Sequence, residues 1–260
     1  MLGSSTVGKD TGPITVFLHA VGISAWMWKP VIAALPGSRA LLIDLPGHGD
    51  SNHIPWASLE DTAQQVAATI DQHHKGEDLH IVGLSLGSYV GMTLLAQRPE
   101  AYKTAMLSGM HAGGMPKKWQ MKLITLFTAP LAARPFFARK TAHMLGGGDA
   151  DIEGFVAEAG RTNSTAFRRA TNNVVDYELP ENVDQIRARL LVTAGSKEHA
   201  LIRNALEDIT KRIPQAQALE VPDVGHGWSS EKPQLFAQTL REHIDGSKME
   251  AARLQSRSKA

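Results

Sequence analysis

The chain has 260 residues, which suits one large α/β domain carrying an insertion. Hydrophobic residues make up 43% and charged residues 20%, as in an ordinary globular protein, and the formal charge of +1 excludes a general attraction to polyanions. Cysteine is absent, which excludes disulfides and thiolate metal sites, and we expect neither a nucleic-acid nor a membrane partner.

The amino-terminal segment Met1 to Gly12 is polar and glycine-rich, without the basic and then apolar pattern of a secretory signal. No later segment holds about eighteen uninterrupted apolar residues, the length of a membrane span. These features favour a cytoplasmic protein.

Six apolar runs, rich in β-branched residues and ended by glycine, proline or polar residues, predict buried strands. They cover residues 14–18, 39–44, 79–82, 104–108, 190–194 and 218–221. Helical spacing is found between and after them, at 28–35, 59–73, 88–95, 202–209 and 234–244. Strands that alternate with helices predict an α/β fold with a mostly parallel sheet covered on both faces, and chemistry at the carboxyl ends of the strands.

The interval 112–183 interrupts this alternation with helical segments only, near 119–127, 136–145, 152–159 and 167–175. We interpret it as a helical cap over the strand ends, with Gly146-Gly147-Gly148 as a hinge. The predicted domains are therefore a core of residues 1–111 and 184–245, the cap, and a flexible tail of residues 246–260.

The pentapeptide Gly83-Leu84-Ser85-Leu86-Gly87 lies between a predicted strand and a predicted helix. Small residues two before and two after Ser85 allow a strained turn that exposes the serine hydroxyl. An ordinary glycine-rich connection is the structural alternative, because the pattern by itself is weak. Partners for Ser85 decide between the two.

A serine nucleophile needs a base and an acid that orients the base, and the later strand ends supply candidates for both. His226 lies in the loop Val224-Gly225-His226-Gly227 after the last strand. Glu198 follows the preceding strand, and Asp223 is less suitable because it is too close to His226 on the same loop. The order serine, acid, histidine is that of this type of turn.

These motifs resemble those of the α/β-hydrolase superfamily, and the chain is similar to a serine esterase-like member with a helical cap. Two more segments contribute: His19-Ala20-Val21-Gly22 followed by Trp28, and 44–51, which reads DLPGHGDS. The resemblance covers Ile14 to about Ile244. It implies the fold of that superfamily and an oxyanion hole made by the backbone N–H groups of Leu86 and Val21.

The chain departs from the family pattern at three places. Ala20 replaces the usual glycine of the oxyanion loop, and Glu198 replaces the usual aspartate. Other members carry the acid after an earlier strand, where this chain has 108–111, SGMH, without a carboxylate. Only a short segment precedes the first clear strand, so the opening hairpin of larger members is expected to be lost or reduced to a short edge strand.

Apolar residues in the cap and near the strand ends are expected to form the cap core and an apolar substrate pocket. The pocket candidates are Trp26, Met110, Met115, Trp119, Phe127, Phe155 and Trp228. The first half of the cap also carries basic residues with no acid between them, at Lys117, Lys118, Lys122, Arg134, Arg139 and Lys140. They suit an anionic substrate or a membrane surface, but a solvated helix face is the favoured interpretation.

The predicted function is a serine hydrolase that cleaves an ester or lactone of a small to medium apolar substrate, acting as a monomer or homodimer. Ser85 attacks, His226 carries the proton and Glu198 orients His226. No cofactor or metal is expected. The alternatives are another enzyme on this scaffold, such as a C–C hydrolase, lyase or perhydrolase, and a non-catalytic protein that binds a small ligand.

Overall fold

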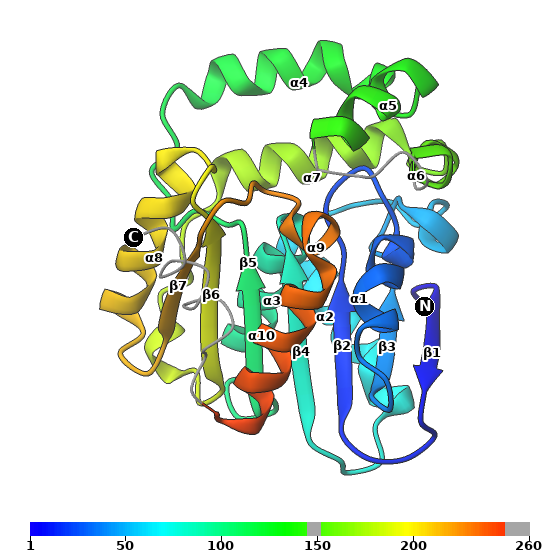
Figure 1. Cartoon of the computed structure of the whole chain (residues 1–260). Coiled ribbons are helices and arrows are strands. Elements are labelled where there is room, and N and C mark those ends of the chain that lie inside the picture. Colours follow the sequence, from blue (N-terminus) through cyan, green and yellow to red (C-terminus); the bar gives the residue numbers. More distant parts are fainter. Residues whose placement is uncertain (145–151, 248–260) are drawn as a thin grey trace.

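The computed structural model describes residues 1–144 and 152–247, so the predicted glycine hinge and most of the predicted tail lie outside the described residues. In the described part, seven strands form one sheet in the order β1-β3-β2-β4-β5-β6-β7 (Figure 1). The strands are β1 (Ser4–Gly8), β2 (Ile14–Leu18), β3 (Arg39–Ile43), β4 (Leu79–Leu84), β5 (Thr104–Ser108), β6 (Arg189–Gly195) and β7 (Gln217–Val221). The predicted mostly parallel α/β sheet is confirmed.

Strand β1 is the one antiparallel member of this sheet. It pairs with β3, Ser4 opposite Ile43 and Gly8 opposite Arg39, and all of its residues are exposed. The short polar edge strand expected at the amino terminus is therefore present. The other neighbours pair in parallel, so the carboxyl ends of β2 to β7 meet at one edge of the sheet.

Helices cover both faces of the sheet, and alternate strand residues feed the two cores. Val16 and Ile81 point to a core under α2 (Leu59–His73), α3 (Leu86–Gln97) and α8 (Ala200–Arg212). Phe17 and Val82 point to the other core, which packs on α1 (Lys29–Ala33), α9 (Trp228–Glu231) and α10 (Pro233–Asp245). A short 3-10 helix, η1 (Ala25–Trp28), precedes α1; α9 was not predicted, because four residues give no helical period.

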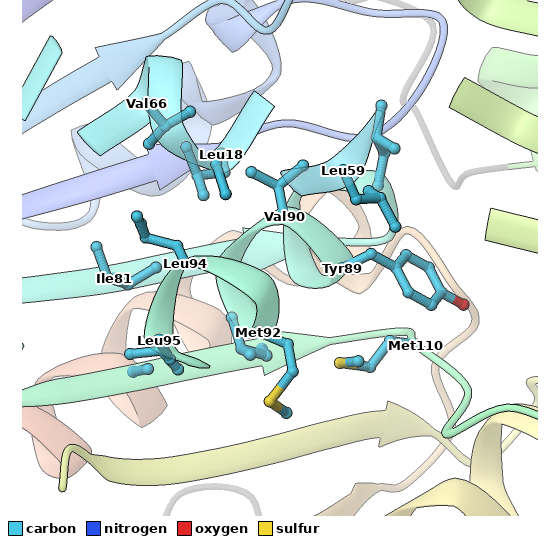
Figure 2. Close-up of a cluster of buried hydrophobic side chains, with 14 of the residues drawn as sticks. Leu18, Leu59, Val66, Ile81, Tyr89, Val90, Met92, Leu94, Leu95 and Met110 are labelled. Atoms are coloured by element: carbon cyan, nitrogen blue, oxygen red, sulfur yellow. The ribbon is translucent and has the colours of Figure 1, made fainter. Parts of the chain in front are cut away.

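Helix α3 lies at the centre of the molecule. Every residue from Leu86 to Ala96 is buried, so the helix is apolar on all sides, as expected of a fully enclosed helix. Figure 2 shows Val90 on the side of Leu18 and Met92 on the side of Met110. The residue that precedes α3, Ser85, is thereby held in a rigid setting.

The cap helices are α4 (Lys118–Ala132), α5 (Pro135–Met144), α6 (Ile152–Ala159) and α7 (Ser164–Asp176), and they lie above the carboxyl ends of the strands (Figure 1). The amino terminus of α7 rests on the loop after β3, where Asn163 N–H donates to the Gly47 carbonyl at 2.7 Å. A Cβ on Gly47 would lie 2.0 Å from the Ala166 Cβ, so this contact requires glycine. Within the described ranges, no helix has both the length and the apolar character needed to cross a bilayer.

The contact between α3 and the sheet allows a stability test. A Cβ on Gly87 would lie 2.1 Å from the Leu18 carbonyl oxygen, which is backbone, whereas one on Gly91 would meet the movable end of the Leu107 side chain at 2.8 Å. Gly87→Ala is expected to lower the free energy of unfolding by about 2 kcal/mol more than Gly91→Ala. Urea unfolding of both variants measures this difference, and equal losses would show that α3 moves freely away from β2.

Candidate active site

Ser85 lies in the turn between β4 and α3 with φ of 52° and ψ of −117°, a left-handed conformation that non-glycine residues rarely adopt. The two flanking glycines explain how the turn closes. A Cβ on Gly83 would lie 2.5 Å from the Gly87 carbonyl oxygen. The strand and the helix therefore meet more closely than side chains allow, and Ser85 takes the strained conformation that this approach requires.

Ser108, at the end of β5, connects this turn to the loop that carries His226. Its carbonyl accepts hydrogen bonds from Ser85 N–H at 2.9 Å and from the Ser88 hydroxyl at 2.7 Å. The Ser108 N–H donates to the Ser88 hydroxyl at 2.9 Å, and the Trp228 indole N–H donates to the Ser108 hydroxyl at 2.8 Å. One buried serine thus fixes both sides of the site.

Glu198 and His226 come from two different strand ends and meet directly. The Glu198 Oε2 lies 2.6 Å from His226 Nδ1, and Oε1 accepts the Gly195 N–H at 2.9 Å. The Glu198 side chain is only 2% exposed, whereas that of His226 is 35% exposed. A carboxylate on Nδ1 keeps the proton there, which leaves Nε2 with a lone pair directed away from Glu198.

Close backbone packing positions the acid and histidine loops against each other. Lys197 N–H donates to the Val224 carbonyl at 3.0 Å, and a Cβ on Gly195 would lie 2.4 Å from that same carbonyl oxygen. Gly109, with φ of +71°, lies under the imidazole, where a Cβ would be 2.7 Å from His226 Cε1. Neither the Ser85 hydroxyl nor His226 Nε2 has a hydrogen-bond partner among the described residues, so both are available to a substrate.

His19 fixes the loop that carries Val21. Its Nε2 accepts the Leu45 N–H at 2.8 Å, so Nδ1 carries the proton and donates to the Ala20 carbonyl at 2.7 Å. In a trans peptide the N–H points opposite to the C=O, so this bond also sets the direction of the Val21 N–H. Ala20 is not left-handed, and its Cβ therefore causes no strain where the family usually has glycine.

Two backbone N–H groups at this edge have no acceptor within the described part of the chain. Leu86 is the first residue of α3, where helical N–H groups lack internal partners, and Val21 follows the bond fixed by His19. A helix amino terminus of this kind favours negative charge. Both N–H groups are therefore open to an anionic group at this edge of the sheet.

An apolar cavity of about 50 Å³ lies next to His226. The core side of its lining includes Ala20, Ile23, Trp26 and Met27, and the cap contributes Ala142 of α5 and Phe155 of α6. A Cβ on Gly154 would lie 2.3 Å from the Trp26 ring, so the cap backbone presses directly on this wall. On its other side His226 borders an open groove that contains Lys197, His199 and His143.

The structure brings together only part of the predicted pocket. Trp26 and Phe155 line the cavity. Met110 and Trp228 are buried in the two cores, and Met115 is half-buried outside the cavity lining. Trp119 and Phe127 are each 68% exposed on α4, away from the lining, because α4 turns its large side chains outward.

Sequence reasoning did not identify Ser88, Ser108 and Gly109 as parts of the site. Their position in the chain could have indicated them. Ser108 ends β5, the neighbour of β4, and Gly109 follows it, and functional residues of parallel sheets lie at the carboxyl ends of the strands. The lining residues Ile23 and Met27 were also missed. They follow β2 in a loop whose helical turn, η1, is too short to give a period.

The family model described as "Alpha/beta hydrolase family" matches residues 15–239. The chain belongs to the alpha/beta hydrolase family. Most members of this family are enzymes, and the sheet order and helical layers described above are those of the family fold.

The chain is similar to proteins that are named for different activities. A 2-succinyl-6-hydroxy-2,4-cyclohexadiene-1-carboxylate synthase of Serratia proteamaculans (strain 568) is 26% identical, covering 91% of this chain and 95% of that protein. An sn-1-specific diacylglycerol lipase of Mus musculus is 26% identical, covering 90% and 81%. The structure of an enol-lactonase from Burkholderia xenovorans LB400 superimposes with a TM-score of 0.77 at 21% identity, covering 94% and 96%.

The buried histidines under the site generate a pH prediction. Burial lowers the pKa of His19 to about 4 and that of His48 to about 3, and the rings contact edge to face at 5.1 Å. Because the unfolded state binds protons from about pH 6.5 downward and the folded state does not, stability falls as pH falls from 6.5 toward 4. Between pH 7.5 and pH 5, each ring is expected to lower the free energy of unfolding by about 2 kcal/mol.

Urea unfolding of wild type and His48→Gln at the two pH values tests this. The pH-dependent loss is expected to shrink by about 2 kcal/mol in the variant. His53→Gln is the matched control, because it removes an exposed imidazole without touching the buried pair. An unchanged loss in His48→Gln would contradict the assignment.

Proposed function

We propose that this chain is a serine hydrolase that cleaves a carboxylic ester or lactone of an apolar, small to medium substrate through an acyl-enzyme. The observation that carries the proposal is the contact of Glu198 with His226 Nδ1 at 2.6 Å, at the same edge of the sheet as a strained Ser85 with a free hydroxyl. A glycine-rich connection without function would not need the acid, the base and the strain at one edge.

The proposed reaction has two steps. His226 Nε2 takes the Ser85 proton as Oγ bonds to the carbonyl carbon, and the same proton passes to the leaving alcohol when the ester C–O bond breaks. Water then attacks the acyl-enzyme by the same route, which releases the acid and restores Ser85. Glu198 holds the imidazole and stabilises its charged form throughout.

The Leu86 and Val21 N–H groups are proposed to stabilise the developing oxyanion. Preorganised donors of this kind are worth several kcal/mol each, more than one polar side chain nearby would supply. His19 supports the second donor through the Ala20 carbonyl, at 2.7 Å. The neutral state of His19 is needed for this, since its Nε2 must keep accepting Leu45 N–H.

The cavity lining favours an apolar substrate. No lysine or arginine is among the described residues that line it, so a carboxylate product, such as the one named for the synthase relative, would find no counter-charge there. The mouse relative is by name a lipase of diacylglycerol, which is an ester. An ester or lactone is therefore favoured over the reaction of the synthase relative.

Labelling and turnover test the three roles. A fluorophosphonate probe is expected to label Ser85, located by mass spectrometry, and Ser85→Ala is expected to lose both the label and turnover of p-nitrophenyl esters. Glu198→Gln is expected to lower kcat by roughly 10³ because the imidazole loses its orienting carboxylate. Asp223→Asn is the matched control, a carboxylate three residues from His226 that is expected to change kcat less than about threefold.

The outcomes separate the alternatives. Loss of turnover in Asp223→Asn but not in Glu198→Gln would show that Asp223, and not Glu198, orients His226. Labelling of Ser85 without turnover of any ester would favour another enzyme on this scaffold. No labelling would remove the nucleophile and favour a protein that only binds a ligand.

The small cavity predicts a preference for short acyl chains. A volume of about 50 Å³ is far below that of typical ligand pockets, so long chains require the cap wall to move. Phe155→Ala is expected to raise the ratio of kcat/KM for octanoyl over butyryl p-nitrophenyl ester by roughly tenfold, since each buried methylene is worth about 0.8 kcal/mol. An unchanged ratio would place the acyl chain elsewhere, for example in the groove beside His143.

A further inference from the structure

Helix α4 is oriented inside out. The side that contacts α7 carries its polar and small residues: Thr125 and Ala129 are buried, Lys118 pairs with Glu178 at 3.0 Å, and Lys122 pairs with Asp176 at 2.5 Å. Its large apolar side chains point to solvent, namely Trp119, Met121, Leu123, Ile124, Leu126, Phe127 and Leu131. A surface helix normally has the opposite arrangement.

Helix α5 continues the same surface. Phe136 is 74% exposed, Phe137 is 37% exposed, and their rings contact edge to face at 5.6 Å. Figure 1 shows α4 across the top of the molecule, on the side of α7 away from the sheet, with α5 beside it. We call the exposed apolar residues of α4 and α5 the cap face. A patch of this extent marks an interaction site rather than scattered surface residues.

The charge of this region is strongly uneven. Residues 112–148 contain six lysines and arginines and no acid, while the whole chain has a formal charge of +1, so the remainder carries −5. Three of the six pair with nearby acids: Lys118 with Glu178, Lys122 with Asp176, and Arg139 with Glu153. Lys117, Arg134 and Lys140 are exposed and have no ion-pair partner in the described part of the chain.

We propose that the cap face docks on an anionic lipid bilayer, with its apolar side chains in the interface and Lys117, Arg134 and Lys140 at the lipid phosphates. Exposed tryptophan, phenylalanine and leucine flanked by free cations are what an interfacial helix requires. A second copy of this face would instead bring like charges together. The negative remainder of the chain directs the cap toward an anionic surface, a partner that the sequence alone did not favour.

The cap face is connected to the candidate active site through α5. Ala142 of this helix lines the cavity next to His226, and His143 borders the open groove on the other side. A docked cap would thus place the cavity wall near the bilayer, and an amphipathic ester could enter from the lipid. This link rests on the proposed function, whereas docking does not, so docking is tested in the Ser85→Ala background as well as in wild type.

Vesicle binding tests the proposal directly. Co-sedimentation is expected with vesicles of phosphatidylcholine mixed with phosphatidylglycerol, and weaker with pure phosphatidylcholine or at high salt. Ile124→Ser with Phe136→Ser is expected to lower the partition coefficient by at least about tenfold, because both side chains leave water on docking. Both residues are exposed, so the fold and the hydrolysis of soluble esters are expected to stay unchanged.

A charge pair gives the matched control. Arg134→Glu with Lys140→Glu is expected to weaken binding to the anionic vesicles by about tenfold. Lys9→Glu with Lys75→Glu makes the same charge change at exposed residues of the core and is expected to leave binding within about twofold. Equal loss in both pairs would show unspecific attraction and overturn the proposal.

Fluorescence gives the orientation. Trp119 is 68% exposed, whereas Trp28, Trp56 and Trp228 are fully buried and Trp26 lies in the cavity wall, so lipid-borne quenchers are expected to reach mainly Trp119. Trp119→Phe is expected to lose this quenching and still sediment with vesicles. The proposal is wrong if no vesicle binding occurs, or if wild type binds vesicles and Ser85→Ala does not. It is also wrong if sedimentation velocity shows a dimer that becomes a monomer in Ile124→Ser with Phe136→Ser.

Discussion

The close approach of α3 to the sheet is the constraint on which the site depends. Gly83 and Gly87 carry no Cβ at points where one would overlap backbone atoms, and Ser85 between them takes φ of 52°. Such a conformation costs about 1–3 kcal/mol for a non-glycine residue and persists only where its surroundings hold it. Here the buried α3 and the hydrogen bond from Ser85 N–H to Ser108 supply that hold.

The end of β5 also positions His226. Ser108 accepts the Trp228 indole N–H, and the next residue, Gly109, lies directly under the His226 ring. Ser108 fixes the segment that follows His226 through the hydrogen bond from Trp228, and Gly109 leaves room for the imidazole because it has no side chain. The serine and the histidine are therefore positioned from one point, although 140 residues lie between them in the sequence.

The sheet and the catalytic candidates could be predicted because they depend on local patterns. The strands β2 to β5 are buried along their whole length, and the glycines that flank Ser85 are needed because a Cβ on either would overlap backbone atoms. Glu198 and His226 were predicted as a pair because each follows the end of one of the last two strands. Ser88 and Ser108 could not be found in this way, because their roles are hydrogen bonds between segments that only the folded topology brings together.

The cap shows where periodicity gives the helix but not its orientation. Helical spacing on 119–127 is compatible with either face inward, and large apolar residues favour the buried one. In the structure the polar stripe of α4 faces α7 instead, and Lys122 and Lys118 on that stripe pair with Asp176 and Glu178. Such exposed pairs are worth little individually, so an orientation that leaves this much apolar surface in water gains by meeting an apolar phase. The cap thus combines two surfaces: α6 and α7 are fastened to the core, for example by Ser24 to Glu158 at 2.6 Å, while α4 and α5 face outward.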